Sequence, residues 1–343
     1  MEKGYKMKTE KKDSHPDEIA AASHGAGADT KTLMKKRDNY LKTSCLSALV
    51  AKKGFTLIEI LTVITIIAIM LGLLMPALSQ IRKLAGEAKQ KAQISSIEIG
   101  LTLYRNDFGE YPPSHGWRAG AVSDEYRYSG AQTLAEAMVG WDLLGFDPNS
   151  KYDPFDGESV YVDTNDRKGP YLDRANIGVY EPNQIFKTLP ANLAERKGHM
   201  ICDVFSFKSE KIGNKRCKIG TPILYFRANL SPDYMQSKAD ASVGVFAENV
   251  YNYGDNFYLM NAGKIANGKN HPICPFDDSP TDAINGSKFY DFIYDPMIPY
   301  PNPRPGDCYG RPVRPDSFLL ISAGYDGLYG TSDDICNFEP NIE

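Results

Sequence analysis

The chain has 343 residues, of which 42% are hydrophobic and 24% charged, so it can form one sizeable globular core together with an extended element. The net charge of −4 is unevenly distributed. Residues 1–54 carry 12 Lys and Arg against 7 Asp and Glu, which leaves −9 on the 289 residues that follow. An acidic bulk without a basic stripe argues against nucleic acid as the main partner.

Residues 55–78 form a continuous apolar segment, FTLIEILTVITIIAIMLGLLMPAL, in which Glu59 is the only charged residue. As a helix, these 24 residues would span roughly 36 Å, enough to cross the hydrocarbon core of a bilayer. Two lysines come directly before the segment, so the positive-inside tendency places residues 1–53 in the cytoplasm and everything after Leu78 outside it. An acid inside such a segment costs on the order of 2.5–3.5 kcal/mol, which marks Glu59 as a functional candidate.

Three other interpretations of this segment compete. A secretory signal peptide would have a shorter apolar core, no internal acid and a small-residue cleavage site after it. An ordinary membrane anchor gives no reason for an acid near its start. A buried core helix rarely carries so many consecutive apolar residues.

Residues 52–59, KKGFTLIE, resemble the cleavage and methylation site of type IV pilins and type II secretion pseudopilins. The resemblance implies that residues 1–54 are a cytoplasmic leader. A prepilin peptidase/methyltransferase would cut after Gly54 and methylate the new amino terminus on Phe55. Gly72 and Pro76 stand where the family also places helix-weakening residues, and the proline predicts a kink or a melted stretch.

Cleavage would create a cation on Phe55, four residues from the Glu59 carboxylate. When subunits pack helix against helix, the Glu59 of one subunit can pair with the amine of its neighbour. Burying either charge alone would be costly, so the pair would help to fix the axial register between subunits.

The resemblance also implies the partners and the location of the chain. The partners would be other pilin-like subunits, in homo- and hetero-filaments, and an inner-membrane assembly platform. We therefore expect a single-pass protein of the inner membrane, with its head on the periplasmic side and its filament in the periplasm or at the cell surface.

The leader of 54 residues is longer than those usual in the family, and Met34 would give a leader of more typical length. Both Met1 and Met34 therefore stand as candidate starts. Residues 1–33 mix polar and small residues without periodicity, so we expect them to be disordered.

Residues 79–108 predict an amphipathic helix that continues the membrane helix, because apolar residues recur at steps of three and four. The apolar positions are Ile81, Leu84, Ala88, Ile94, Ile97, Leu101, Tyr104 and Phe108. Gly109 can cap this helix and Pro112 cannot continue it, which places its end near residue 108. Residues 104–112, YRNDFGEYP, resemble the helix exit of the pseudopilin family.

Residues 109–343 form the predicted globular head. Its predicted elements are one helix at 131–144, strands at 222–226, 257–260 and 318–322, and an extended proline-rich connection at 296–315. The fold class is therefore α+β: a long N-terminal helix, half transmembrane and half amphipathic, packed on a small antiparallel sheet with large loop insertions.

The carboxy-terminal loop is a candidate calcium site. Residues 317–336, SFLLISAGYDGLYGTSDDIC, lead from an apolar strand into glycines and three acids, and calcium takes six to eight oxygen ligands. The loop resembles the calcium loop of the major pseudopilin. That resemblance implies Asp326 and Asp333 as side-chain ligands, Asp334 as a further candidate, and backbone oxygens near Ala323 and Leu328. The alternative is a solvated acidic turn.

Five of the six cysteines follow Gly54, at positions 202, 217, 274, 308 and 336. Outside the cytoplasm they can form at most two disulfides, whose connectivity the sequence does not give. Two His-x-x-Cys pairs, beginning at His199 and His271, could also assemble a zinc site, although disulfides are the preferred role of these cysteines.

The leading functional interpretation is a structural subunit of a type II secretion pseudopilus, which assembles through its N-terminal helix to drive protein export. One alternative is a type IV pilin for adhesion, motility or DNA uptake. Another, from a different class, is a surface carbohydrate-binding protein that uses the pilin segment as an anchor. No nucleophile elbow, P-loop, HExxH or dinucleotide motif occurs, so we do not expect an enzyme.

Overall fold

The computed structural model describes residues 54–114, 129–148, 151–152, 159–160, 166–186, 198–231, 235–236, 249–262, 270–273, 287–298 and 308–342. The expectations for the leader before Gly54, including the disorder of residues 1–33 and the start at Met34, lie outside these residues. The chain divides into two compact units, Met1–Leu71 and Gly72–Glu343.

Helix α2 spans Leu57–Phe108 and is continuous through Pro76. The prediction of a melted stretch at Pro76 is therefore wrong. A proline removes one backbone hydrogen bond, and the other backbone hydrogen bonds of the helix are kept on both sides of it.

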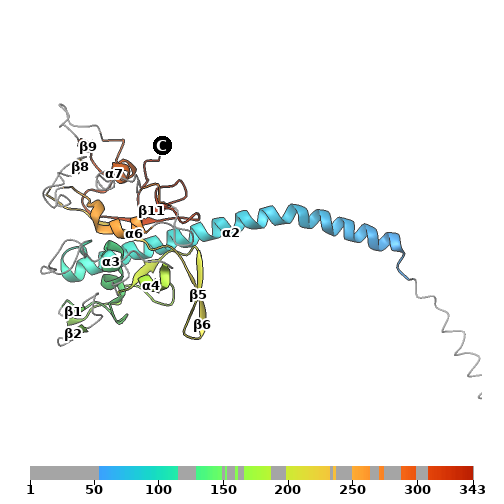
Figure 1. The fold of residues 1–343 in the computed structure, drawn as a ribbon, viewed down its shortest axis with the longest axis horizontal. Coiled ribbons are helices and arrows are strands. Elements are labelled where there is room, and N and C mark those ends of the chain that lie inside the picture. The colour runs from blue at the N-terminus through green and yellow to red at the C-terminus, as the bar shows by residue number, and fades with distance from the viewer. Residues whose placement is uncertain are drawn as a thin grey trace, which may run out of the picture. The chain divides into compact units, whose positions relative to one another are not determined.

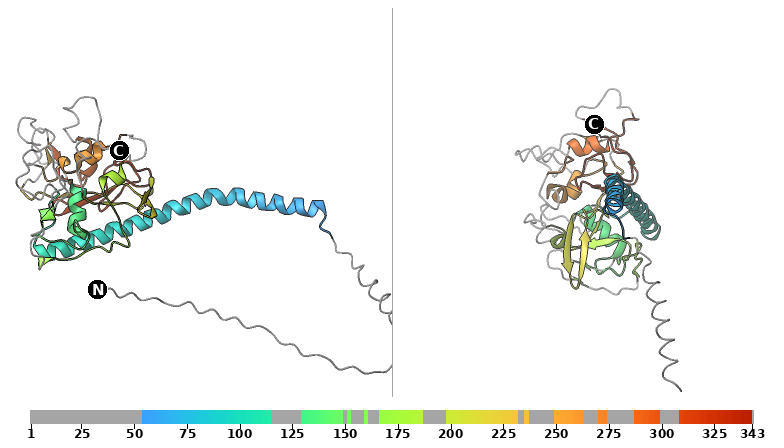
Figure 2. Two further views of the ribbon diagram at one scale, coloured as in Figure 1. Left: turned by 60° about the horizontal axis from the view of Figure 1, so that its bottom comes forward. Right: turned by 90° about the vertical axis from the view of Figure 1, so that its right-hand side faces the viewer.

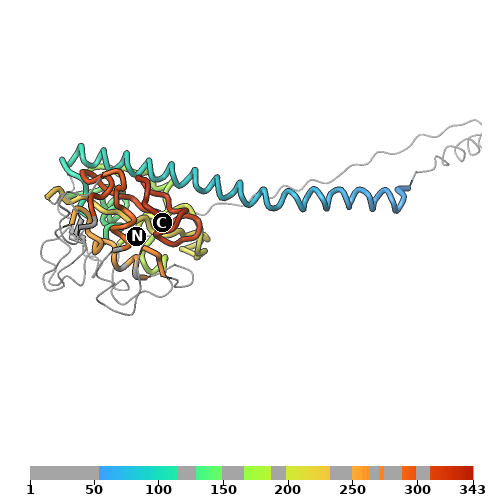
Figure 3. Tube along the Cα trace, turned by 90° about the horizontal axis from the view of Figure 1, so that it is seen from above, coloured from blue at the N-terminus to red at the C-terminus, as the bar shows by residue number. Residues whose placement is uncertain are grey.

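The second half of α2 buries the predicted apolar stripe only from Gln90 onward. Ile97 and Leu101 are completely buried, whereas Ile81 and Leu84 remain 60% and 63% exposed. The stripe therefore begins later than the sequence pattern predicts, because the described head first packs closely against the helix at Gly86, next to the ring of Phe205. From there the helix runs along one side of the head (Figure 3).

The end of α2 is confirmed. The helix stops at Phe108, and Gly109 follows with φ +87°, a conformation that side chains rarely adopt. The Gly109 N–H donates to the Arg105 carbonyl at 2.7 Å. The chain then turns back onto the sheet, where the hydroxyl of Tyr225 donates to the Pro112 carbonyl at 2.6 Å.

The central sheet has three antiparallel strands in the order β11–β10–β7. They are β7 (Leu224–Arg227), β10 (Phe318–Ser322) and β11 (Ile335–Cys336). In the register, Leu319 lies opposite Phe226, and Ser322 lies opposite Ile335. The strand predicted at 318–322 is confirmed, and the one predicted at 222–226 is shifted by one or two residues.

Alternate side chains of the fully buried strand β10 enter two different hydrophobic clusters. Phe318 and Leu320 join the cluster formed with α2 and with α3 (Gly130–Val139). Leu319 and Ile321 join the cluster on the opposite face. On that face lie residues of η5 (Tyr253–Asn256), α6 (Phe257–Asn261) and α7 (Ser287–Ile293). Helices α6 and α7 are labelled in Figure 1.

Two predicted elements differ from the structure. Residues 257–260, predicted as a strand, lie in helix α6, because a short apolar run does not distinguish a strand from a buried helical turn. The helix predicted at 131–144 ends at Val139, where Gly140 adopts φ +82° and its N–H donates to the Glu136 carbonyl.

The remaining strands form four two-stranded antiparallel pairs. They are β1 (Lys151–Tyr152) with β2 (Ser159–Val160), β3 (Gly178–Tyr180) with β4 (Met200–Cys202), β5 (Lys208–Ile212) with β6 (Lys215–Ile219), and β8 (Met235–Gln236) with β9 (Cys308–Gly310). A short helix, α4 (Pro182–Ile185), lies between β3 and β4 in the chain. Most of these strands lack the alternation that predicts a strand, and β9 falls inside the stretch predicted as an extended connection.

Candidate functional site

The N-terminus of α2 is capped by Thr56 and Glu59, which form a capping box. The Thr56 backbone N–H donates to Glu59 Oε2 at 2.8 Å, and the Thr56 hydroxyl donates to the same oxygen at 2.7 Å. In return, the Glu59 N–H donates to Thr56 Oγ1 at 3.3 Å. The predicted assembly residue therefore has a second role within its own chain. The sequence signal for it, a threonine followed three residues later by glutamate, was overlooked.

The apolar first half of α2 presents its side chains outward. All described side chains from Phe55 to Leu84 are exposed, and the values of Phe55 and Leu57 reach 79% and 82%. In the part of the chain that the structure describes, α2 is the one helix long and apolar enough to cross a membrane. Apolar surface of this extent needs lipid or other helices to cover it.

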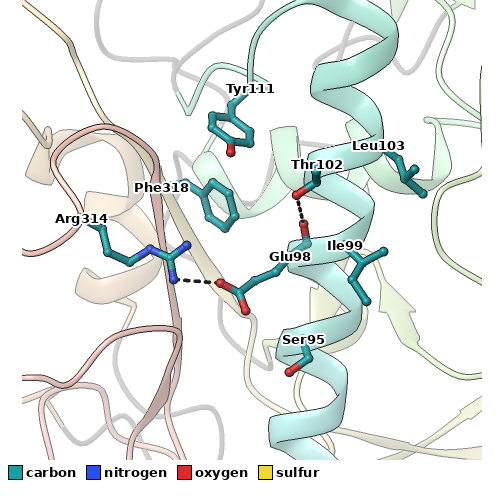
Figure 4. Close-up of a pocket in the computed structure, with 8 residues that line it drawn as sticks. All are labelled: Ser95, Glu98, Ile99, Thr102, Leu103, Tyr111, Arg314 and Phe318. Carbon is teal, nitrogen blue, oxygen red and sulfur yellow. Dashed lines mark hydrogen bonds and ion pairs between the residues drawn. The ribbon is translucent and has the colours of Figure 1, made fainter.

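Helix α2 also lines a shallow pocket of about 430 Å³ beside its amphipathic half. In the close-up of Figure 4, Ile99 and Leu103 line it from the helix, while Tyr111 and Phe318 line it from the turn after the helix and from β10. Arg314 reaches across and forms an ion pair with Glu98 at 2.9 Å. This pocket was not predicted, because Arg314 and Glu98 are 216 residues apart in sequence.

The structure brings the predicted residues of the carboxy-terminal loop together and connects them by hydrogen bonds. Asp333 Oδ2 accepts from the Asp326 N–H at 2.8 Å, and Asp334 Oδ2 accepts from the Gly330 N–H at 2.7 Å. The Thr331 hydroxyl lies 2.7 Å from Asp333 Oδ1 and 3.4 Å from Asp334 Oδ1. Thr331 was not among the predicted residues.

The two predicted backbone ligands of the loop are also occupied by internal hydrogen bonds. The Ala323 carbonyl accepts from the Gly327 N–H at 3.1 Å, and the Leu328 carbonyl accepts from the Thr331 hydroxyl at 3.2 Å. Each carbonyl or carboxylate oxygen has a second lone pair, so these bonds leave room for a cation.

The loop depends on glycine where its two ends approach each other. Gly324 has φ +62°, and a Cβ there would lie 2.1 Å from the Asp333 carbonyl oxygen. This close approach places Asp326 and Asp333 beside each other.

The electrostatics of the loop are unfavourable for a third negative charge. The pKa of Asp334 is raised to about 8, chiefly by burial. The charges of Asp333 and Asp326 also raise it, while the hydrogen bonds from the backbone of Gly330 and Thr331 lower it. A cation between these carboxylates would remove the repulsion. The donor set is nevertheless small: among the described residues, no group of three or more His, Cys, Asp or Glu side chains could hold a metal ion.

The alternative of a zinc site gains no support from the described residues. His271 is buried and uses its Nδ1 atom to accept the Tyr329 N–H at 3.1 Å, so it holds the carboxy-terminal loop. Cys274 lies outside the described residues. Cys202, Cys217 and Cys336 are free, so the expected disulfides are absent among these three.

A buried acid at the base of the same loop also escaped prediction. Asp203 follows β4 and accepts hydrogen bonds from the N–H groups of Phe205 and Thr221, each at 3.1 Å. Burial raises the pKa of Asp203 well above its usual value. Its other oxygen lies 3.4 Å from the hydroxyl of Ser322, the last residue of β10 before the loop.

Comparisons with known proteins agree with the N-terminal geometry. Residues 50–75 match the family described as the prokaryotic N-terminal methylation motif. The chain is 28% identical over 111 residues to the type II secretion system core protein G of Escherichia coli (strain K12), which covers 32% of this chain and 72% of the relative. It is 36% identical over 61 residues to the protein of the same name from Pectobacterium carotovorum subsp. carotovorum, which covers 18% and 39%. No solved structure matches the chain.

In its methylation motif and in the long apolar helix that follows it, the chain is similar to pilin-like proteins. In particular, it is similar to the type II secretion system core protein G of these two bacteria.

Proposed function

We propose that the chain is a structural subunit of a type II secretion pseudopilus, which assembles through α2 and whose growth drives protein export. The observation that carries this proposal is the exposed apolar half of α2, which contains one charged side chain, Glu59, at its start. Lipid covers such a surface before assembly, and the helices of neighbouring subunits can cover it afterwards.

The chemistry of assembly follows from the mature amino terminus. Cutting after Gly54 puts an ammonium group on Phe55, beside the capping box of Thr56 and Glu59. Within one chain, Glu59 accepts hydrogen bonds from Thr56, and it is the one charged side chain of residues 55–78. In an assembled filament the ammonium of a neighbour can pair with the Glu59 carboxylate, because two opposite charges buried together cost less than either buried alone.

Partners and location follow from this proposal. The prepilin peptidase processes the chain, other pilin-like subunits join it in the filament, and the inner-membrane platform assembles them. The secretion role is preferred over a type IV pilus because both curated relatives are named as secretion proteins.

Substitutions at Glu59 test the proposal. Glu59→Val should leave membrane insertion and cleavage intact and abolish filaments, because it removes the register charge. Glu59→Gln keeps an acceptor for the Thr56 N–H but lacks the charge, so it should also fail to form filaments. Thr65→Val is the matched control, because it replaces a polar side chain on the same helix whose hydroxyl bonds only to the Leu61 carbonyl.

Filaments are measured by electron microscopy of sheared material, and insertion by immunoblot of the membrane fraction. Wild-type amounts of filament from Glu59→Gln would show that filament formation needs the hydrogen bonds between Thr56 and residue 59 but not the charge, and would refute the register role. Wild-type amounts from Glu59→Val would refute both roles.

We also propose that the carboxy-terminal loop binds calcium. Asp326 and Asp333 would supply carboxylate oxygens, with Asp334 as a further ligand and the carbonyl oxygens of Ala323 and Leu328 beside them. The support is the closeness of these acids, since the Asp326 N–H donates to Asp333 Oδ2 at 2.8 Å. Burial raises the pKa of Asp334, and the charges of Asp333 and Asp326 add to the effect. Because no three of the described acidic side chains are placed to hold a metal ion, calcium would have to draw these oxygens together. Its charge would then favour the ionised form of Asp334 and tie the loop to the end of β10.

A further inference from the structure

The β5–β6 hairpin is a basic element in an otherwise acidic head. Its sequence, KSEKIGNKRCKI at residues 208–219, contains five Lys and Arg and one acid, Glu210. Among the described strands, β5 and β6 pair only with each other. The two strands form a separate ribbon at the edge of the head in Figures 1 and 2. The prediction that the chain has no basic stripe overlooked this ribbon.

One face of the hairpin carries only cations and a serine. In the register, Lys211 lies opposite Arg216, and Ser209 lies opposite Lys218. Because side chains alternate along a strand, these four residues share one face, here called the cationic face. All four are exposed. The acid of the hairpin, Glu210, lies on the other face, where it forms an ion pair with Lys208.

The cationic face carries an unfavourable arrangement that the described chain does not compensate. Like charges directly opposite each other destabilise a strand pair. Among the described residues, Lys211, Arg216 and Lys218 form no ion pair. An anionic surface outside the chain would relieve this repulsion.

The hairpin begins close to the end of the apolar segment. Strand β5 follows directly after Phe207. Two residues earlier, the ring of Phe205 packs against α2, and a Cβ added to Gly86 would lie 2.9 Å from that ring. Gly86 is eight residues beyond Leu78, which at 1.5 Å per residue is about 12 Å along the helix. That distance is comparable with the Debye length of about 10 Å at 0.1 M salt, so charges at this level are close enough to act on a membrane surface.

We propose that the cationic face docks on anionic lipid headgroups at the outer surface of the membrane that holds residues 55–78. This inference rests on the membrane insertion in the proposed function. A lipid surface fits better than a protein partner, because protein interfaces depend on buried aromatic or aliphatic anchors and this face has none. Diffuse attraction between Lys or Arg and anionic lipid needs no such anchor. Docking would hold the head against the membrane until the subunit enters a filament.

The test is hydrogen exchange of the mature full-length chain in lipid nanodiscs, followed by mass spectrometry of peptides from residues 208–219. Nanodiscs of phosphatidylcholine alone are compared with nanodiscs that also contain phosphatidylglycerol. The hairpin should exchange more slowly in the anionic nanodiscs, and high salt should abolish the difference.

The test variant is Lys211→Gln with Arg216→Gln. Each cation near an anionic surface contributes about 1 kcal/mol, so removing two should shift the ratio of docked to free hairpin about 30-fold. The matched control, Lys168→Gln with Lys288→Gln, removes two exposed cations elsewhere on the head and should keep the protection. Lys168 pairs with Phe146, whose ring contacts Phe108 at the far end of α2.

Three results would overturn the proposal. Equal exchange of the hairpin in both kinds of nanodisc, while the chain co-elutes with them, would refute docking and leave the membrane span intact. Protection that appears in neutral nanodiscs only after other subunits are added would assign the face to a protein partner. Failure of the chain to co-elute with nanodiscs would refute the membrane span together with the docking.

Discussion

Replacing Asp334 by asparagine should change how the stability of the head depends on pH. Burial raises the pKa of Asp334 to about 8, from the usual 3.8. Between these values the folded head keeps a proton that the unfolded chain releases, so its free energy of unfolding falls as pH rises. In the Asp334→Asn variant the side-chain amide oxygen would still accept the Gly330 N–H, but the group cannot titrate.

The magnitude follows from the width of this pH window. Each unit of pH inside this window changes the free energy of unfolding by about 1.4 kcal/mol. Because of Asp334, the free energy of unfolding of the wild-type head should therefore fall by about 3 kcal/mol between pH 5 and pH 7. Burial also raises the pKa of Asp203, which acts in the same direction. Because Asp203 is present in both proteins, the difference between wild type and Asp334→Asn isolates Asp334.

The assay is urea denaturation of a head lacking residues 1–78, followed by circular dichroism at several pH values with chelator present. The wild-type head should lose stability relative to Asp334→Asn as pH rises from 5 to 7. Saturating calcium should reduce that difference, because a cation favours the ionised carboxylate. Parallel pH profiles of the two proteins in chelator would refute the buried, repelled state of Asp334.

Two further predictions concern the loop and the helix. The head should melt at a higher temperature in calcium than in chelator. At a hundredfold excess of calcium over Kd, the added stability is about 2.7 kcal/mol. Asp326→Ala should remove most of this response while the circular dichroism spectrum stays native. Identical melting of the wild-type head in both conditions would show that the loop is only an acidic turn. Leu101→Ala should destabilise the head by about 2–5 kcal/mol in denaturant titrations, because Leu101 is completely buried. Ile99→Ala, whose side chain on the same helix is 63% exposed, should change stability by about 0.5 kcal/mol or less, and an equal loss in both variants would contradict the packing of α2.

The long helix and its end could be predicted from sequence because both signals are local. The apolar run fixes the first half, the three-and-four periodicity fixes the second, and Gly109 ends it. Strand β10 was predictable for a similar reason, since five consecutive apolar or small residues before a glycine-rich loop are typical of a buried strand.

Other features depend on contacts between distant parts of the chain, which periodicity does not contain. Whether residues 257–260 form a strand or a helical turn is decided by the packing of Leu259 and Met260 in the buried cluster that also contains Phe289. The residue of α2 at which burial begins depends on where the ring of Phe205 packs against the helix. The ion pair of Arg314 with Glu98 likewise joins residues that are far apart in the sequence.

Of the carboxy-terminal loop, sequence reasoning found all three acids but not the groups that hold them. Thr331 and the Gly330 N–H bind the acids through local turns, and His271 fixes the loop from a separate segment. The cationic face of the hairpin was missed for another reason. The alternation of Lys211, Arg216 and Lys218 on one face becomes visible only once the strand register is known.

The most direct test of the central claim is mass spectrometry of the amino terminus of the chain isolated from membranes. A pilin-like subunit should begin with N-methylated Phe55, and Gly54 should tolerate little beyond alanine, because the peptidase needs a small residue before the cut. A chain that begins after Met75 or Ala77 would instead identify residues 55–78 as an ordinary signal peptide. An unprocessed chain that retains residues before Gly54 would equally contradict assembly through a free amine on Phe55.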